Sequence, residues 1–79
     1  MNEYLLIEPM PFGDYKIALY KRWDSISHFD KDYFVPGLPC ASHVVKALNL
    51  RRIHDGEQPY PVFIWDIATE TEKPFISNI

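Results

Sequence analysis

The sequence predicts a single α+β domain over residues 1–79, in which a small antiparallel sheet packs on one helix in the order β-β-α-β-β. Three observations predict this class. Apolar and polar residues alternate near the N-terminus, as in a strand with one buried face. Apolar residues then recur at helical spacing in the middle of the chain. Seven prolines and three glycines divide the 79 residues into short elements, and a chain of this length forms one domain.

The N-terminal part predicts a hairpin. Residues 4–8, YLLIE, form the first strand, and residues 9–14, PMPFGD, form the turn. Residues 15–23, YKIALYKRW, alternate most clearly. One face of this second strand holds Tyr15, Ile17, Leu19 and Trp23, and the other holds Lys16, Tyr20 and Arg22. Residues 24–37 show no sustained period, so we expect a long connection that folds back over the core.

Residues 38–50, LPCASHVVKALNL, predict the helix. Pro39 suits the first helical turn, where a missing N–H group is harmless. An apolar stripe at helical spacing consists of Cys40, Ala41, Val44, Val45 and Leu48. Asn49 tolerates the left-handed conformation that closes helices, so we expect the helix to end there. A straight helix that continued to Ile53 would expose both Leu50 and Ile53.

The C-terminal part predicts a second hairpin. Residues 61–67, PVFIWDI, form a strand with Phe63, Trp65 and Ile67 on one face. A polar turn follows, and residues 74–78, PFISN, form a short return strand. Pro74 lacks a backbone donor, which predicts that this last strand lies at a sheet edge.

The run VFIWDIATETEKPFI at residues 62–76 resembles, locally, one blade of a WD-repeat propeller. A blade needs ~40–45 residues, and typically 4–8 blades close the ring. No second copy of the pattern occurs in the chain, so the resemblance does not predict a propeller. We interpret Trp65 and Asp66 as structural, with the aspartate at the strand end able to accept backbone N–H bonds.

The composition indicates the compartment in which the protein resides and the kinds of partner it can bind. Eleven acidic and eight basic residues give a net charge of −3 without a clustered basic surface, which disfavours nucleic acid as a partner. Cys40 is the only cysteine, whereas secreted domains of this size normally carry disulfides. The N-terminal sequence MNEYLLIEPMPFG lacks the basic start and long apolar run of a signal peptide or membrane helix. We therefore expect a cytoplasmic protein with no membrane partner.

Candidate metal-binding and catalytic groups are sparse. Cys40 and His43 lie three residues apart on the predicted helix, and His54 could add a third ligand, but a structural zinc site needs four. Cys40 as a nucleophile would need an activating group and a substrate pocket. Asp30 and Asp32 begin a calcium-loop pattern whose glycine and distal glutamate are absent. We predict no metal, no cofactor and no enzymatic activity; an enzyme or metal protein centred on Cys40, His43 and His54 is one alternative.

The high content of aromatic residues is the feature of the composition that says most about function. Twelve of the 79 residues are Phe, Trp or Tyr, and a core built against one helix holds roughly half of them. We expect five aromatic side chains to remain partly exposed: Tyr4, Tyr20, Tyr33, Phe34 and Tyr60. Interface cores are enriched in such side chains and in arginine. The predicted protein-binding residues are therefore Tyr20, Arg22, Tyr33, Phe34 and Tyr60.

The function we predict is a small non-enzymatic binding protein that acts through this aromatic-rich surface on another protein, or on a second copy as a homodimer. One alternative is an inhibitor of a host defence or nucleic-acid machine, encoded by a phage or mobile element. Another is a weak single-strand nucleic-acid binder. In that case Tyr20, Trp23 and Arg22 would stack on bases, and Lys16 and Lys21 would contact the backbone.

Overall fold

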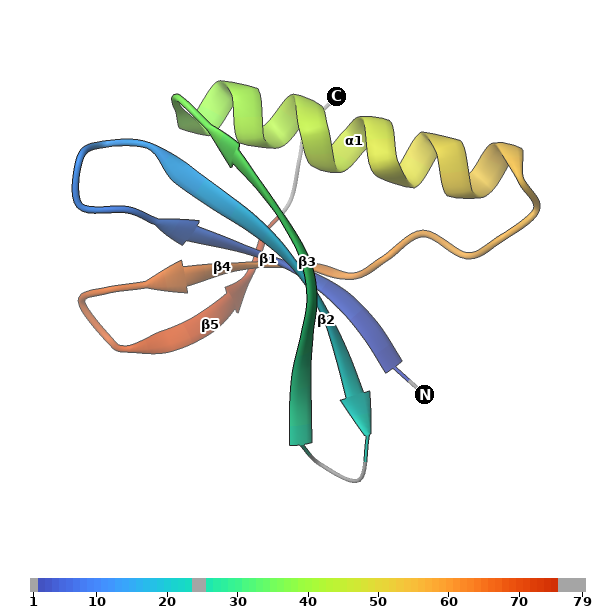
Figure 1. Cartoon of the computed structure of the whole chain (residues 1–79), viewed down its shortest axis with the longest axis horizontal. Helices are drawn as coiled ribbons and strands as arrows, with labels where there is room; N and C mark the ends of the chain where they lie inside the picture. Colours follow the sequence, from blue (N-terminus) through green and yellow to red (C-terminus); the bar gives the residue numbers. More distant parts are fainter. Residues whose placement is uncertain (1, 24–25, 76–79) are drawn as a thin grey trace.

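The computed structural model of the chain describes residues 2–23 and 26–75, and of residues 2, 22, 23 and 26–30 it describes the backbone. The elements in chain order are β1 (Asn2–Pro9), β2 (Tyr15–Trp23), β3 (Ile26–Val35), α1 (Leu38–His54), β4 (Val62–Asp66) and β5 (Thr71–Pro74). One twisted sheet packs against α1 (Figure 1). The predicted α+β class, with a sheet on one helix, is confirmed.

The five strands lie in the order β3-β2-β1-β4-β5, with β1 at the centre. The pairs β1–β2, β2–β3 and β4–β5 are antiparallel. The pair β1–β4 is parallel, with Leu5 opposite Val62 and Ile7 opposite Ile64. The sheet is therefore mixed, where the sequence predicted an antiparallel one. The reason is the path of the chain, because α1 carries it from β3 across the sheet to the far side of β1.

The predicted long connection at residues 24–37 is wrong, because most of it forms the edge strand β3. A β-bulge explains why the alternation of apolar and polar residues typical of a strand is not visible in this part of the sequence. Leu19 of β2 pairs with Lys31 and the next residue, Tyr20, pairs with Phe29, so Asp30 is an extra residue in β3. An extra residue shifts the two-residue alternation by one position. The apolar residues on the two sides of the bulge therefore follow different phases.

Helix α1 is longer than predicted and ends at His54 instead of Asn49. Its end is a Schellman motif around Gly56, whose φ of 80° is left-handed. Gly56 N–H donates to the carbonyl of Ile53 at 3.0 Å, and Glu57 N–H donates to that of Arg52 at 2.8 Å. Leu50 and Ile53 are 54% and 56% exposed, as a helix of this length requires.

The start of the helix and its buried stripe also differ in part from expectation. Pro39 lies in the first turn, as predicted, and Gly37 is the N-cap with extended backbone and no side-chain cap. The buried helical residues are Ala41 and Val45. Cys40, predicted on the apolar stripe, is exposed instead, because α1 rests on the sheet along the neighbouring side of the helix.

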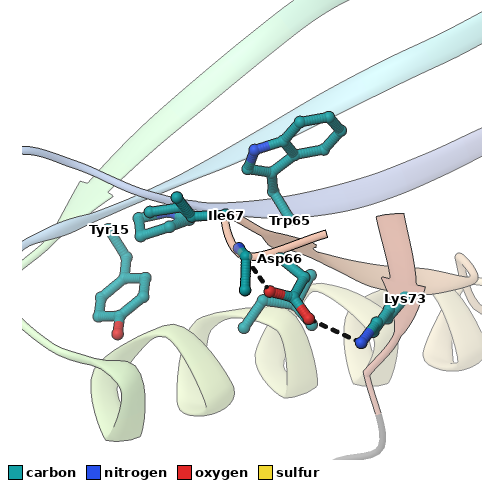
Figure 2. Close-up of a pocket in the computed structure, with 8 residues that line it drawn as sticks. Tyr15, Trp65, Asp66, Ile67 and Lys73 are labelled. Atoms are coloured by element: carbon teal, nitrogen blue, oxygen red, sulfur yellow. Dashed lines mark hydrogen bonds and ion pairs between the residues drawn. The ribbon is translucent and has the colours of Figure 1, made fainter. Parts of the chain in front are cut away.

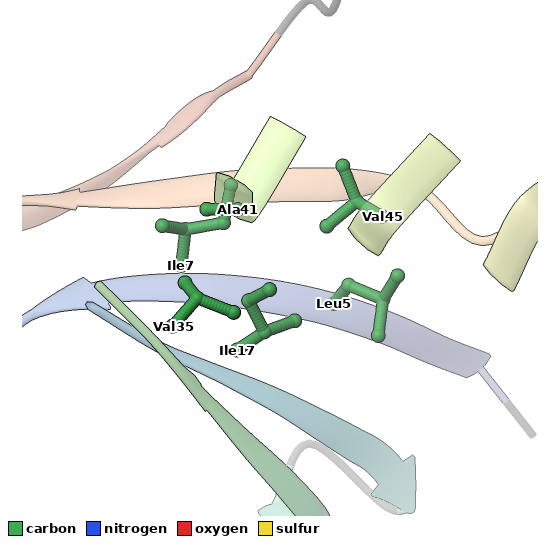
Figure 3. Close-up of a cluster of buried hydrophobic side chains, with 6 residues drawn as sticks. All are labelled: Leu5, Ile7, Ile17, Val35, Ala41 and Val45. Atoms are coloured by element: carbon green, nitrogen blue, oxygen red, sulfur yellow. The ribbon is translucent and has the colours of Figure 1, made fainter. Parts of the chain in front are cut away.

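The core lies between α1 and one face of the sheet (Figure 3). Its buried side chains are Leu5, Ile7, Ile17, Val35, Ala41 and Val45. Complete burial of a side chain such as Ile7 or Ile17 contributes about 1.5–3 kcal/mol. Strand β1 is buried on both of its faces, because Tyr4, Leu5, Leu6 and Ile7 are all buried. On the second face, which α1 does not cover, neighbouring side chains therefore shield the centre around Tyr4 and Leu6 from water, while the margins remain accessible.

The C-terminal hairpin is present but is displaced along the sequence. The return strand is Thr71–Pro74, earlier than the predicted 74–78, and residues 76–78 lie outside the described part of the chain. The turn is correspondingly tighter, and Glu70 within it has a positive φ of 53°. Pro74 does lie on an edge strand, as predicted.

Candidate functional site

The candidate site is the face of the sheet turned away from α1, which we call the open face. Side chains alternate between the two faces of each strand. Since Leu5, Ile7, Ile17 and Val35 pack under the helix, their neighbours along each strand belong to the open face. Figure 2 shows this directly, with Tyr15 pointing toward α1 and Trp65 pointing away from it. The described side chains of the open face are Tyr4, Leu6, Glu8, Lys16, Ala18, Tyr20, Asp32, Phe34, Phe63, Trp65, Glu72 and Pro74.

Three aromatic rings from three strands form a cluster on the open face, in which the ring of Tyr4 contacts the other two. Tyr4 and Tyr20 are direct cross-strand partners, and their rings stack with centroids 5.4 Å apart and planes at 17°. Phe63 meets Tyr4 edge to face, at 5.8 Å and 85°. Such pairs contribute about 0.5–1.5 kcal/mol beyond the area they bury. This aromatic cluster, Tyr4, Tyr20 and Phe63, is therefore held in a defined arrangement before any partner binds.

Polar atoms at the margin of the cluster are also ordered. Tyr20 Oη donates a hydrogen bond to Glu8 Oε1 at 3.0 Å, and Lys16 Nζ lies 3.3 Å from Glu8 Oε2. Tyr4 Oη donates to Glu72 Oε2 at 3.5 Å. Burial, followed by the hydrogen bond to Glu8 and its negative charge, raises the pKa of Tyr20 to about 12. Tyr20 is therefore a neutral hydrogen-bond donor at physiological pH.

The structure separates the residues that the sequence predicted as one binding surface. Tyr20 and Phe34 both lie on the open face, and Phe34 is 61% exposed. Tyr33 lies on the helix side and packs against the core, with Lys31 Nζ 5.4 Å from its ring centroid. Tyr60 also packs against the core, from the segment before β4. Arg22 belongs to β2, but its side chain, like that of Trp23, lies outside the described part of the structure.

Three residues of the open face were missed as site residues, namely Tyr4, Phe63 and Trp65. The prediction that Tyr4 is partly exposed is wrong, because it is only 7% exposed within the aromatic cluster. The alternation in β4 placed Phe63 and Trp65 correctly on one face. The missing information was which face the helix covers. That depends on contacts between distant segments, and no local pattern reports it.

A shallow groove of about 330 Å³ lies at the end of the sheet, between the two hairpins (Figure 2). Asp66 and Lys73 form an ion pair of 2.7 Å beside it. Asp66 Oδ1 also accepts the N–H group of Ala68 at 2.9 Å, which confirms the predicted role of this aspartate at the strand end. The bond from Lys73, and then that from Ala68, lowers the pKa of Asp66 below its ordinary value.

The remaining candidate groups stay dispersed on α1, where Cys40, His43 and His54 are all exposed. Within residues 2–23 and 26–75, no three His, Cys, Asp or Glu side chains are grouped closely enough to hold a metal ion. No helix in the described part of the chain combines the length and apolar composition needed to cross a bilayer. Comparison with protein-family models, with curated proteins and with solved structures finds no match to this chain.

Proposed function

We propose that the protein binds another protein through the open face of its sheet, and that it does so without catalysing a reaction. One observation carries the proposal, which is the presence of four partly or largely exposed aromatic side chains, around the buried Tyr4, on a sheet face that no described helix covers: Tyr20, Phe34, Phe63 and Trp65. The pairs β1–β2, β2–β3 and β4–β5 are antiparallel, and the solvent-facing side of antiparallel strands normally carries polar residues. Aromatic side chains instead are typical of the centres of protein interfaces.

The order already present on this face favours binding. Tyr20 is held by its stack on Tyr4 and its bond to Glu8. Fixing a mobile side chain on association costs about 0.5–1.5 kcal/mol, so side chains that are fixed beforehand lower this cost. Phe34, on the neighbouring edge strand, supplies exposed apolar surface at the margin.

The charge of the open face helps to distinguish a protein partner from nucleic acid and from a second copy of the chain. Its described side chains include the carboxylates of Glu8, Asp32 and Glu72 and the ammonium group of Lys16. The described part of this face therefore offers no cluster of cations for phosphates, which disfavours a single-strand nucleic-acid binder. A second copy docking its own open face would bring like charges together. A different protein is therefore the partner that this face fits best.

An inhibitor of a host defence or nucleic-acid machine, encoded by a phage or mobile element, is one form that this proposal can take. Its support is the short acidic chain of 79 residues, and an aromatic face that could cover a functional surface of a larger protein. Such an inhibitor would also use the open face as its contact surface.

Site-specific photo-crosslinking tests the proposal. Benzoylphenylalanine replaces Phe34 on the open face or, as a matched control, Ile53 on α1, since both side chains are more than half exposed. In cells that naturally produce the protein, we expect a discrete crosslinked protein from position 34 and none from position 53. Adding Trp65→Ser should abolish that product. Equal products from both positions, or products from position 53 alone, would contradict the proposal.

A further inference from the structure

We infer that two copies of the chain associate through the tips of their two hairpins, with Phe12 of each copy inserted into the groove of the other. This association uses the end of the sheet and shares one residue, Trp65, with the open face, but it does not require the open face to bind another protein. The argument rests on the shape of the turn, on the groove and on their placement at the same end of the molecule.

Phe12 is the projecting part of this surface. It is 97% exposed, so its side chain contributes almost nothing to the folded monomer. The turn that carries it is nevertheless ordered: Met10 N–H donates to the carbonyl of Asp14 at 2.8 Å, and Gly13 N–H donates to that of Met10 at 3.2 Å. Gly13 has a φ of 87°, a conformation that glycine adopts without strain. The ring is thus presented on a fixed turn, which reduces the entropy lost when it inserts.

The groove is the receiving part. Its walls come from both hairpins and consist of Pro9, Tyr15, Ile64, Trp65, Asp66, Ile67, Ala68 and Lys73. Pockets that hold small ligands begin at roughly 300 Å³, so a groove of about 330 Å³ has room for an aromatic side chain. Ile67, on its rim, is 64% exposed. The charges at the groove are matched within the monomer, because Asp66 bonds Lys73 and Ala68. Covering them therefore buries no unpaired charge.

The topology places both parts on one surface. Strands β1 and β4 run parallel, so the turns that follow them lie at the same end of the sheet. Figure 1 shows the tips of the two hairpins at the same end of the sheet. Residues of both hairpins line the groove. When a projection and its receptor occupy the same surface, a two-fold arrangement satisfies both at once and closes the assembly. A second copy of this chain is therefore the occupant that the groove fits.

The buried area sets the expected strength of this dimer. An aromatic side chain buries about 150–250 Å² of its own surface, and the groove walls lose a similar area. Two symmetric insertions then bury roughly 600–1,000 Å², which lies below the usual range for stable complexes. We expect a weak dimer, with a dissociation constant between roughly 10 µM and 1 mM.

Sedimentation velocity from about 10 µM to 1 mM, the range set by that area, tests the dimer. The natural chain should show a mass that rises toward twice the monomer's. Phe12→Ser should raise the dissociation constant at least about tenfold, the loss expected for an aromatic anchor. Leu50→Ser, which removes a different exposed apolar side chain on α1, should leave it unchanged. A natural chain that stays monomeric throughout, or a Phe12→Ser variant that matches it, overturns the inference.

Disulfide trapping tests the insertion itself. In a Cys40→Ser background, one copy carries Pro11→Cys, at an exposed position that leaves Phe12 intact, and the other carries Ala68→Cys in the groove wall. The control copy carries Ala47→Cys, which is exposed on α1. Because the dimer would hold positions 11 and 68 close together, we expect their mixed disulfide to form at least about tenfold faster than that between 11 and 47. Equal rates overturn the inference.

Discussion

The side chain of Asn49 exchanges two hydrogen bonds with the backbone of Tyr60. Asn49 Nδ2 donates to the Tyr60 carbonyl at 3.1 Å, and Tyr60 N–H donates to Asn49 Oδ1 at 2.7 Å. Immediately afterwards the chain joins the sheet, where Leu5 N–H donates to the carbonyl of Pro61 at 2.9 Å. Asn49 therefore fixes the point from which β4 enters beside β1.

Asn49→Ala should destabilise the protein. It leaves the partly buried N–H and C=O groups of Tyr60 without their partners, which costs about 1–3 kcal/mol. Urea unfolding followed by circular dichroism measures the loss. His43→Ala, an exposed change on the same helix, should stay within about 0.5 kcal/mol of the natural chain. An unchanged midpoint for Asn49→Ala would show that the paired bonds add no net stability.

Gly56→Ala should also destabilise the protein, for a reason confined to the backbone. A Cβ at this position meets no atom within 4 Å, but the φ of 80° is unfavourable for any residue that has one. The expected loss is about 1–2 kcal/mol, the cost of a left-handed conformation for an ordinary residue. Thermal unfolding measures it. Gly56→Asn, which tolerates this conformation better, should lose less; equal losses would argue against the conformational explanation.

Gly37→Ser should stabilise the protein. Gly37 is the N-cap of α1, its backbone is extended, and no side chain caps the helix. A Cβ there would meet Pro39 Cδ at 3.7 Å, an ordinary contact. A serine oxygen can accept the N–H group of Cys40 in the first turn, and relative to glycine such a cap contributes about a few tenths of a kcal/mol. The midpoint of urea unfolding should rise for Gly37→Ser and not for Gly37→Ala.

Tyr20 should titrate well above the ordinary tyrosine pKa of 10.0, at about 12. Because the folded state holds the phenol proton more tightly than the unfolded state, this contribution to stability is complete below pH 10.0 and is lost as the pH rises toward 12. The ¹³Cζ resonances of the tyrosines report the titration, and Tyr20→Phe assigns the signal. Glu8→Gln should lower the Tyr20 pKa without restoring 10.0, since burial is the larger cause. An unchanged value would exclude Glu8 as a cause.

The Asp66–Lys73 ion pair should make the second hairpin resistant to acid. The ordinary pKa of Asp66 is 3.8, and the folded state lowers it. The resulting stability is present above pH 3.8 and is lost as the pH falls through the lowered pKa. In an NMR titration, Lys73→Gln should shift the Asp66 carboxyl transition to higher pH. Glu70→Gln, which changes an exposed charge in the same turn, should leave that transition in place.

Several elements could be predicted because their signals are local. The alternation in β2, the proline in the first turn of α1 and the aspartate that closes β4 each act over a few residues. The end of α1 also had a local signal, the Asp55-Gly56 pair, which the prediction passed over in favour of Asn49. Strand β3 was harder to predict, because the bulge at Asp30 breaks the periodicity by which a strand is recognised.

The sequence by itself determined where most strands and the helix form, since periods of two and of 3.6 residues are properties of neighbouring residues. Only the tertiary structure decided which side of the sheet α1 covers, and so brought Tyr4, Tyr20 and Phe63 together on the other side. It likewise decided that β4 runs parallel to β1 and brings the two hairpin tips to one end. These outcomes depend on packing between segments that are distant along the chain, which no local pattern contains.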